Sequence, residues 1–178
     1  LTLRTVDFTV DRPAVLPEPT FTFASEKDGN LEFRIASNSP NNSTAYIDWG
    51  DGKIVPYLFF NSPNTISTTS YVAGQTVKVY ADGISQLGFV NKGLNSLDVS
   101  KCPTLTKLDC SQNKLTTIDV SQNPALVWFD CGYNNLSSLN VENNLGLEYL
   151  GCYENKNLSE LNISYNTELT FLDASACN

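Results

Sequence analysis

The sequence contains no histidine, and this absence excludes several kinds of enzyme. Histidine is the commonest general base near neutral pH, the base in Ser/His/Asp and Cys/His systems, and a frequent ligand of catalytic zinc. Basic residues are also scarce, since 11 Lys and Arg stand against 19 Asp and Glu, giving a net charge of −8. That balance argues against nucleic acid or an anionic membrane surface as a partner. No apolar run reaches about 18 residues, so no transmembrane segment is expected.

No signal peptide is visible, and the chain starts at Leu1. We interpret it as either a processed or an artificially trimmed chain, and both interpretations are compatible with the loss of an export signal. Its 178 residues, 41% of them hydrophobic, are enough for one large or two small domains with a packed core. General disorder is therefore not expected.

A sequence repeat occupies the second half of the chain. Copies related to Leu-x-x-Leu-x-Cys begin at Leu105, Leu126, Leu147 and Leu169, in steps of 21, 21 and 22 residues. A degenerate first copy begins at Ile84, one period earlier. Periods of this length are typical of solenoids, and LxxLxCxxNxL is the pattern of a leucine-rich repeat. We therefore predict a solenoid of about four to five repeats over residues 84–178.

Residues 1–83 have the pattern of a small antiparallel β-sandwich. Residues 1–20 carry three prolines and predict an extended lead-in. Six short runs with alternating apolar residues predict strands at 21–25, 31–37, 44–49, 53–60, 64–72 and 75–80. The pair Asp51-Gly52 between two of these runs is a strong hairpin signal. Because a solenoid end exposes its apolar cross-section, we expect the sandwich to pack on the first repeat.

Side chains alternate across a strand, so each repeat points its second Leu and its Cys inward and the residues between them outward. Stacked copies then form a parallel sheet. One interior column holds Leu87, Leu108, Phe129, Leu150 and Leu172, and the next holds Phe89, Cys110, Cys131, Cys152 and Ala174. A buried amide must be paired, so the column of Asn113, Asn134 and Asn155 is expected to bond the backbone of the turning loops. Asn123, Asn144 and Asn166 form a second column in the other half of the repeat.

All five cysteines fall on repeat positions. Three share the interior column, while Cys102 and Cys177 stand where other copies have Asn. The alternatives are a metal site or a redox pair, but no CxxC is present and the stacked cysteines lie on separate strands. We interpret all five as small buried residues, and we predict no metal and no cofactor.

The outward columns form the candidate binding surface. One of them places three aromatic residues side by side, next to Lys107. Exposed Trp and Tyr are enriched at protein interfaces, and their flat faces also suit sugar rings. The alternative is that the aromatics stabilise the sheet through cross-strand pairs, or lie under a neighbouring chain. The candidate ligand-binding residues are Lys107, Trp128, Tyr149, Phe171, Tyr153, Asp109, Asp130 and Asp173.

A second outward column carries aspartates and is interrupted by Gly151. Neighbouring carboxylates raise one another's pKa or attract a cation, so acid/base catalysis and calcium binding are the functional alternatives. The other half of the repeat carries Asp98 and Asp119 at one position, followed by Asn140 and Asn162 in the later copies. We therefore interpret these aspartates as solvated repeat positions, and we predict no catalytic residue.

Two stretches resemble known families. IDWGDG at 47–52, followed by SY at 70–71, Gly74 and VKVY at 77–80, resembles a PKD-type immunoglobulin-like module over residues 21–83. The strings LDVSKCPTLTKLDCSQNKL and LTTIDVSQNPAL resemble the leucine-rich repeats of Bacteroides-type surface proteins, which are related in pattern to internalins. This second resemblance covers residues 84–178. It implies an exported, often lipid-anchored surface protein that acts in binding or adhesion.

The sequence therefore predicts a non-enzymatic cell-surface adhesion protein that binds a protein or a glycan through the exposed concave face of its repeats. A polysaccharide-holding accessory module for a partner enzyme, a hydrolase using the Asp column and a structural spacer are the alternatives. We expect an extracellular location on a bacterial surface, with a lipid anchor carried by the removed N-terminal segment. The sequence defines neither the ligand nor the oligomeric state.

Overall fold

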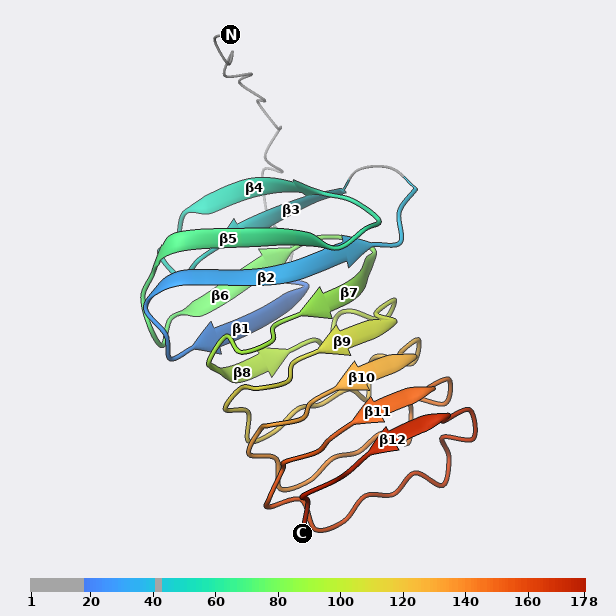
Figure 1. The fold of residues 1–178 in the computed structure, drawn as a ribbon. Coiled ribbons are helices and arrows are strands. Elements are labelled where there is room, and N and C mark those ends of the chain that lie inside the picture. The colour runs from blue at the N-terminus through green and yellow to red at the C-terminus, as the bar shows by residue number, and fades with distance from the viewer. Residues whose placement is uncertain (1–17, 41–42) are drawn as a thin grey trace, which may run out of the picture.

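The computed structural model describes residues 18–40 and 43–178, which form twelve β-strands and no helix (Figure 1). Most of the predicted lead-in, residues 1–17, lies outside this range. The first eight strands are β1 (Phe21–Ser25), β2 (Gly29–Ser37), β3 (Ser43–Asp48), β4 (Ile54–Phe59), β5 (Asn64–Tyr71), β6 (Thr76–Tyr80), β7 (Ile84–Gly88) and β8 (Leu94–Asp98). The last four are β9 (Lys107–Asp109), β10 (Trp128–Asp130), β11 (Tyr149–Gly151) and β12 (Phe171–Asp173). The first six lie within two residues of the predicted runs.

The strands form two sheets. The five-stranded sheet has the order β4-β3-β6-β1-β8 and is antiparallel throughout. The seven-stranded sheet has the order β12-β11-β10-β9-β7-β2-β5. Its pairs are antiparallel between β5, β2 and β7, and parallel from β7 to β12. The predicted combination of an antiparallel sandwich with a parallel solenoid sheet is therefore confirmed, and the two parts share a sheet.

The core of the sandwich is a cluster of phenylalanine rings. Phe21, Phe23, Phe33 and Phe89 are at most 1% exposed, and their ring centroids lie 4.9–6.3 Å apart. Phe89 follows β7 and belongs to the first repeat, so this repeat fills the sandwich core. Burying four such rings removes a large apolar area from water. The predicted boundary near residue 83 thus separates two stretches of chain that share one hydrophobic cluster.

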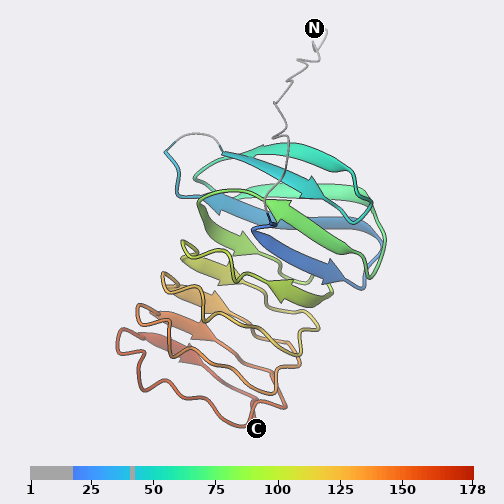
Figure 2. The same cartoon turned by 180° about the vertical axis from the view of Figure 1, so that it is seen from behind.

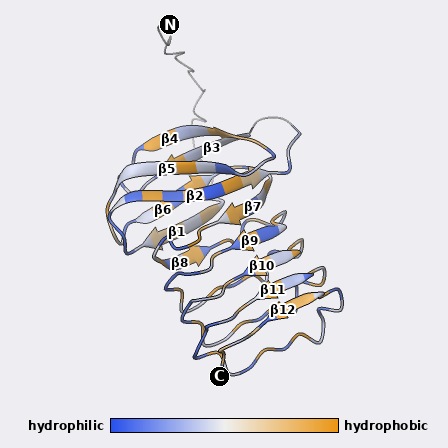
Figure 3. Cartoon of the chain, in the orientation of Figure 1, coloured by the Kyte–Doolittle hydropathy of each residue, from blue (hydrophilic) through white to orange (hydrophobic). Residues whose placement is uncertain are grey.

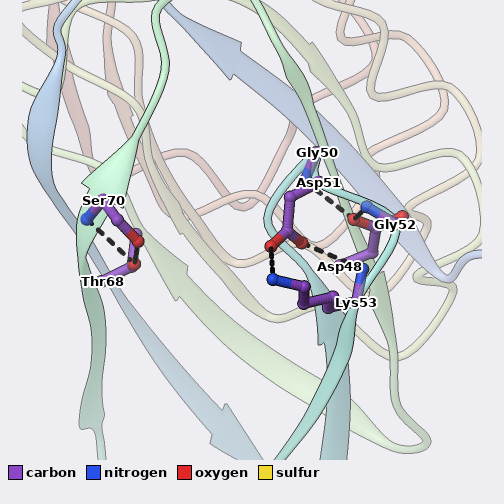
Figure 4. A network of polar contacts seen from close by, with 7 residues as sticks. All are labelled: Asp48, Gly50, Asp51, Gly52, Lys53, Thr68 and Ser70. Carbon is purple, nitrogen blue, oxygen red and sulfur yellow. Dashed lines mark hydrogen bonds and ion pairs between the residues drawn. The ribbon is translucent and has the colours of Figure 1, made fainter.

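The hairpin between β3 and β4 follows from the residues at its turn (Figure 4). One carboxylate oxygen of Asp48 accepts hydrogen bonds from the backbone N–H groups of Gly50 and Gly52, at 2.8 and 2.9 Å. Both glycines have positive φ, +100° and +75°, which other residues rarely adopt. A Cβ on Gly50 would also lie 2.6 Å from the Cβ of Gln75. The predicted Asp-Gly hairpin is therefore confirmed.

In the solenoid, each coil contributes one short strand to the sheet and a largely irregular return segment on the opposite side (Figure 2). The parallel register places Leu108, Phe129 and Leu150 opposite one another, and all three are fully buried. Cys110, Cys131 and Cys152 are also 0% exposed. The predicted inward and outward phase of these repeats is therefore confirmed. In the last coil, Leu172 is 41% exposed.

The first asparagine column bonds adjacent coils together. The side-chain amide of Asn134 donates to the carbonyl oxygens of Cys110 and Cys131, at 2.9 and 3.0 Å, and its oxygen accepts the N–H of Leu115 at 3.0 Å. Asn113 and Asn155 repeat this pattern one coil away on either side. Each amide thus satisfies backbone groups of two coils where no regular ladder exists, as predicted.

The second asparagine column uses only its donors. The amide nitrogen of Asn144 donates to the carbonyl oxygens of Val120 and Asn123, at 3.1 and 2.9 Å. Asn123 and Asn166 do the same in their own coils. The buried side-chain oxygens of these three asparagines have no hydrogen-bond partner in the structure. This column, which the sequence predicted only as a second row of asparagines, is therefore half satisfied.

All five cysteines are free thiols in this structure. We predicted that all five are buried, and this is confirmed for four of them: Cys102 is 1% exposed and Cys110, Cys131 and Cys152 are 0% exposed. Cys177 is only partly buried, and its thiol donates to the carbonyl oxygen of Cys152 at 3.3 Å. It therefore occupies the position of the next asparagine in the first column, with one weak donor in place of an amide.

Candidate binding face

The outward residues of β9 to β12 form one straight row. The register pairs Lys107 with Trp128, Trp128 with Tyr149, and Tyr149 with Phe171. The amino group of Lys107 lies 4.2 Å from the centroid of the Trp128 ring. Trp128 and Tyr149 are half-buried, and Phe171 is 48% exposed. We call these four residues the ring row. In Figure 3, the ribbon of β9 is coloured mainly as hydrophilic and that of β12 mainly as hydrophobic.

The rings of this row stack face to face. The centroids of Trp128 and Tyr149 are 4.7 Å apart with an interplanar angle of 11°, and those of Tyr149 and Phe171 are 4.7 Å apart at 2°. Each face of Tyr149 is therefore covered by a ring. One face of Trp128 is covered by Tyr149 and the other by the ammonium of Lys107. Except for the outer face of Phe171, the row offers ring edges rather than ring faces.

Two glycines in the outward columns make room for larger neighbours. A Cβ on Gly132 would lie 2.5 Å from the ring of Tyr153, so this ring packs directly against the glycine. A Cβ on Gly151 would lie 3.1 Å from the carboxylate of Asp130. Tyr133 meets Tyr153 edge to face, with the centroids 5.4 Å apart. The interruptions in the outward columns are thus filled by side chains from the next or the preceding coil.

Asp130 is the most enclosed of the candidate residues, at 7% exposure. Burial raises the pKa of its carboxyl, although hydrogen bonds from the Gly132 N–H and from Tyr153 oppose this. Burial, followed by the charge of Asp130, raises the pKa of Tyr153 to about 12. The same two causes raise the pKa of Tyr149. We expected Asp130 to be solvated, but the structure encloses it among tyrosines.

The aspartates act mainly as turn residues. The carboxylates of Asp109, Asp130 and Asp173 each accept the backbone N–H two residues later, at 2.9–3.2 Å. On the other half of the coil, Asp119 does the same with Ser121, at 2.9 Å, and this bond lowers the pKa of Asp119. Such side-chain to backbone bonds close local turns. This geometry favours the interpretation of the aspartates as repeat positions.

A cleft of about 420 Å³ opens on the same sheet face, beside the ring row. Its wall includes Lys107 and Asp109 from β9 and Gln86 and Gly88 from β7. Glu32 and Arg34 of β2, Thr65 of β5 and the nearby Lys92 complete the polar lining. The repeat pattern predicted that Gln86 and Gly88 lie on the outward face together with Lys107 and Asp109, although only the latter two were candidate binding residues. The residues from β2 and β5 were not predicted there, because their position depends on the antiparallel pairing of β2 with β7, for which the repeat pattern contains no signal.

Within residues 18–40 and 43–178, no group of three His, Cys, Asp or Glu side chains is placed to hold a metal ion. The same part of the chain contains no helix long and apolar enough to cross a bilayer.

The fold and its repeat define a class: the second half of the chain is a leucine-rich-repeat solenoid of about four turns with a 21-residue period. Among solved structures, the chain is similar to the functional domain of InlJ from Listeria monocytogenes, which is described as including a cysteine ladder. The match has 40% identity and a TM-score of 0.52, and it covers 52% of this chain and 21% of the InlJ chain. No family model matches the sequence, and a search of the curated proteins finds no match. The likeness to InlJ thus supports an internalin-like solenoid over half of the chain.

Proposed function

We propose that this chain is a non-enzymatic binding module that recognises a protein through the exposed face of its seven-stranded sheet. The observation that carries the proposal is the ring row, which presents aromatic edges along three neighbouring strands, with Lys107 on a fourth, on the outward face of the sheet. Trp and Tyr are enriched in the parts of protein interfaces that contribute most binding energy. The likeness to an internalin-like solenoid, a fold typical of binding proteins, supports it.

The stacking favours a protein over a glycan as partner. Sugar rings bind aromatic side chains by laying their C–H groups on the electron-rich ring face. In the ring row, both faces of Trp128 and of Tyr149 are occupied. Stacked rings also have little rotational freedom left to lose, so a partner that meets their edges finds a preorganised surface.

We also propose a cellular location for the chain and a module type for its N-terminal sandwich. We infer that the chain functions on a bacterial cell surface, as its resemblance to surface leucine-rich-repeat proteins implies. The turn at Asp48–Gly52, with its two positive-φ glycines, supports a PKD-like module in residues 21–83. Protease treatment of intact cells tests the location: the chain should be degraded without lysis, and protection until lysis would contradict it.

An array of extracellular proteins tests the binding proposal. Wild type should capture at least one protein, and Trp128→Ala with Tyr149→Ala should lose it. Trp128→Phe with Tyr149→Phe keeps a stacked row and should retain part of the binding. The matched control is Leu145→Ala with Tyr165→Ala, which removes two exposed apolar side chains from loops outside the row.

The outcome separates the alternatives. Capture that survives the Trp128/Tyr149 alanine pair and fails in the loop control would place the binding surface elsewhere. Binding to a glycan array, with no protein captured, would support the accessory-module alternative. Binding to neither array would support the spacer.

A further inference from the structure

The cleft beside the ring row is locally cationic in an acidic chain. Arg34, Lys92 and Lys107 line it against two carboxylates, Glu32 and Asp109, so its formal charge is +1 while the whole chain carries −8. Lys92 is already paired with Glu32 at 2.8 Å. Asp109 accepts the hydroxyl and the N–H of Ser111, at 2.7 and 3.2 Å. The two carboxylates of the cleft therefore already have partners.

The remaining two cations have no carboxylate partner. Among the described residues, neither Arg34 nor Lys107 forms an ion pair within hydrogen-bond or contact distance of a carboxylate. The ammonium of Lys107 lies over the ring of Trp128. The pKa of Glu32 is lowered mainly by its partner Lys92, and only at longer range by the charge of Arg34. Arg34 is exposed, and its aliphatic stem lies over Gly88, where an added Cβ would come within 3.3 Å of the Arg34 Cβ. A guanidinium held by its stem over a glycine presents its forked donors to the cleft. This geometry suits a carboxylate.

The first repeat differs from the later ones at the outward position next to Arg34. In the outward column, Gly88 stands where three of the later copies have Asp109, Asp130 and Asp173. An aspartate there would place a carboxylate beside Arg34 and neutralise it. The glycine instead places no carboxylate beside Arg34, whose charge acts only at longer range on Glu32, and it leaves the cleft open.

We propose that this cleft anchors an acidic side chain, Asp or Glu, of an extended segment of the protein partner. Arg34 and Lys107 bind its carboxylate, while neighbouring residues of the segment meet the edges of Trp128, Tyr149 and Phe171. Aromatic edges carry the positive part of the ring quadrupole, so they too favour the oxygen-rich backbone and carboxylates of such a segment. Lys107 belongs to both the cleft and the ring row, which makes the two surfaces one continuous site. This inference rests on the proposed function and adds the chemistry of the partner.

Selection of random linear peptides displayed on phage, with the purified chain as bait, tests the anchor. Wild type should enrich peptides containing Asp or Glu next to apolar residues, and affinities for synthetic copies should fall as salt rises. Arg34→Ala with Lys107→Ala should weaken these peptides by about tenfold or more, since it removes both charge-assisted partners. Gly88→Asp should weaken them similarly without deleting either cation. The charge-matched control, Lys53→Ala with Lys78→Ala, changes exposed lysines outside the seven-stranded sheet and should leave affinity unchanged.

Other results would overturn the anchor in distinguishable ways. Peptides that depend on Trp128 and Tyr149, but show neither acidic enrichment nor dependence on Arg34, would remove the anchor and leave the proposed function standing. Enrichment of no peptide would exclude an extended acidic segment as ligand, while the protein array would still decide the proposed function. Binding of oligogalacturonate that requires Arg34, without peptide binding, would assign the cleft to a sugar carboxylate instead.

Discussion

The face-to-face stack makes a quantitative prediction about Tyr149, which lies in the middle of the ring row. Aromatic pairs of this kind contribute about 0.5–1.5 kcal/mol each beyond their buried area. Tyr149→Ala removes two of them and should lower the free energy of unfolding by about 1–3 kcal/mol through lost stacking, in addition to the loss of buried area. Phe171→Ala removes one and should cost about 0.5–1.5 kcal/mol from stacking. In a chain of this size, 1 kcal/mol corresponds to a change in melting temperature of about 2–4 °C.

A double-mutant cycle isolates the stacking contribution from the loss of apolar area. Urea unfolding of wild type, of both single alanine variants and of the double variant should give a coupling energy of about 0.5–1.5 kcal/mol between Tyr149 and Phe171. Tyr149→Phe keeps the stack and removes only the hydroxyl near Asp130, so it should retain that coupling. A coupling energy of zero, or equal costs for the two alanine variants after correction for area, would show that the rings do not stack in solution.

Three further predictions concern the interior and the enclosed carboxylate. Asn134→Ala leaves buried carbonyl and N–H groups of two coils unpaired, so it should lower the free energy of unfolding by about 2–4 kcal/mol in chemical denaturation. Asn135→Ala, at the exposed neighbouring position, should change it little. Burial raises the pKa of Cys152 to about 12. At pH 8, iodoacetamide should therefore alkylate this thiol orders of magnitude more slowly in the native chain than in the unfolded chain, as measured by mass spectrometry. Comparable rates in the two states would contradict the burial of Cys152. Burial raises the folded-state pKa of Asp130, so above that pKa the folded chain holds an enclosed charge and is less stable. Asp130→Asn should therefore raise the melting temperature at neutral pH, and the gain should vanish as pH falls below the ordinary pKa of an aspartate; a gain independent of pH would contradict this.

The repeat pattern was sufficient to predict the interior of the solenoid. A fixed period combined with strand alternation determines which side each residue faces, so the burial of Leu108, Phe129 and Cys131 follows from the spacing alone. The six sandwich strands were also predictable, because their apolar alternation and turn residues are local. The repeat period and the strand alternation determine whether a side chain points into the core or outward, and this prediction is confirmed for these residues.

The detail of the binding face could not be predicted in this way. Alternation gives the side of the sheet but not the torsion angles of a ring, so the sequence did not show that the faces of Trp128 and Tyr149 would cover each other. It also gave no sign that Asp130 would fill the space above Gly151. The cleft at Arg34 required the pairing of β2 with β7, a contact between residues about fifty positions apart in the chain. These features depend on neighbours from other coils or from the sandwich.

The most direct test of the central claim is hydroxyl-radical footprinting of the chain with and without the protein captured on the array. Tyr149, Tyr153 and Phe171 lie on or beside the ring row, and Tyr165 lies in a loop outside it and is 59% exposed. We predict that the partner protects Tyr149, Tyr153 and Phe171 from oxidation and leaves Tyr165 unchanged. Protection of Tyr165 with no change at Tyr149 and Phe171 would contradict it.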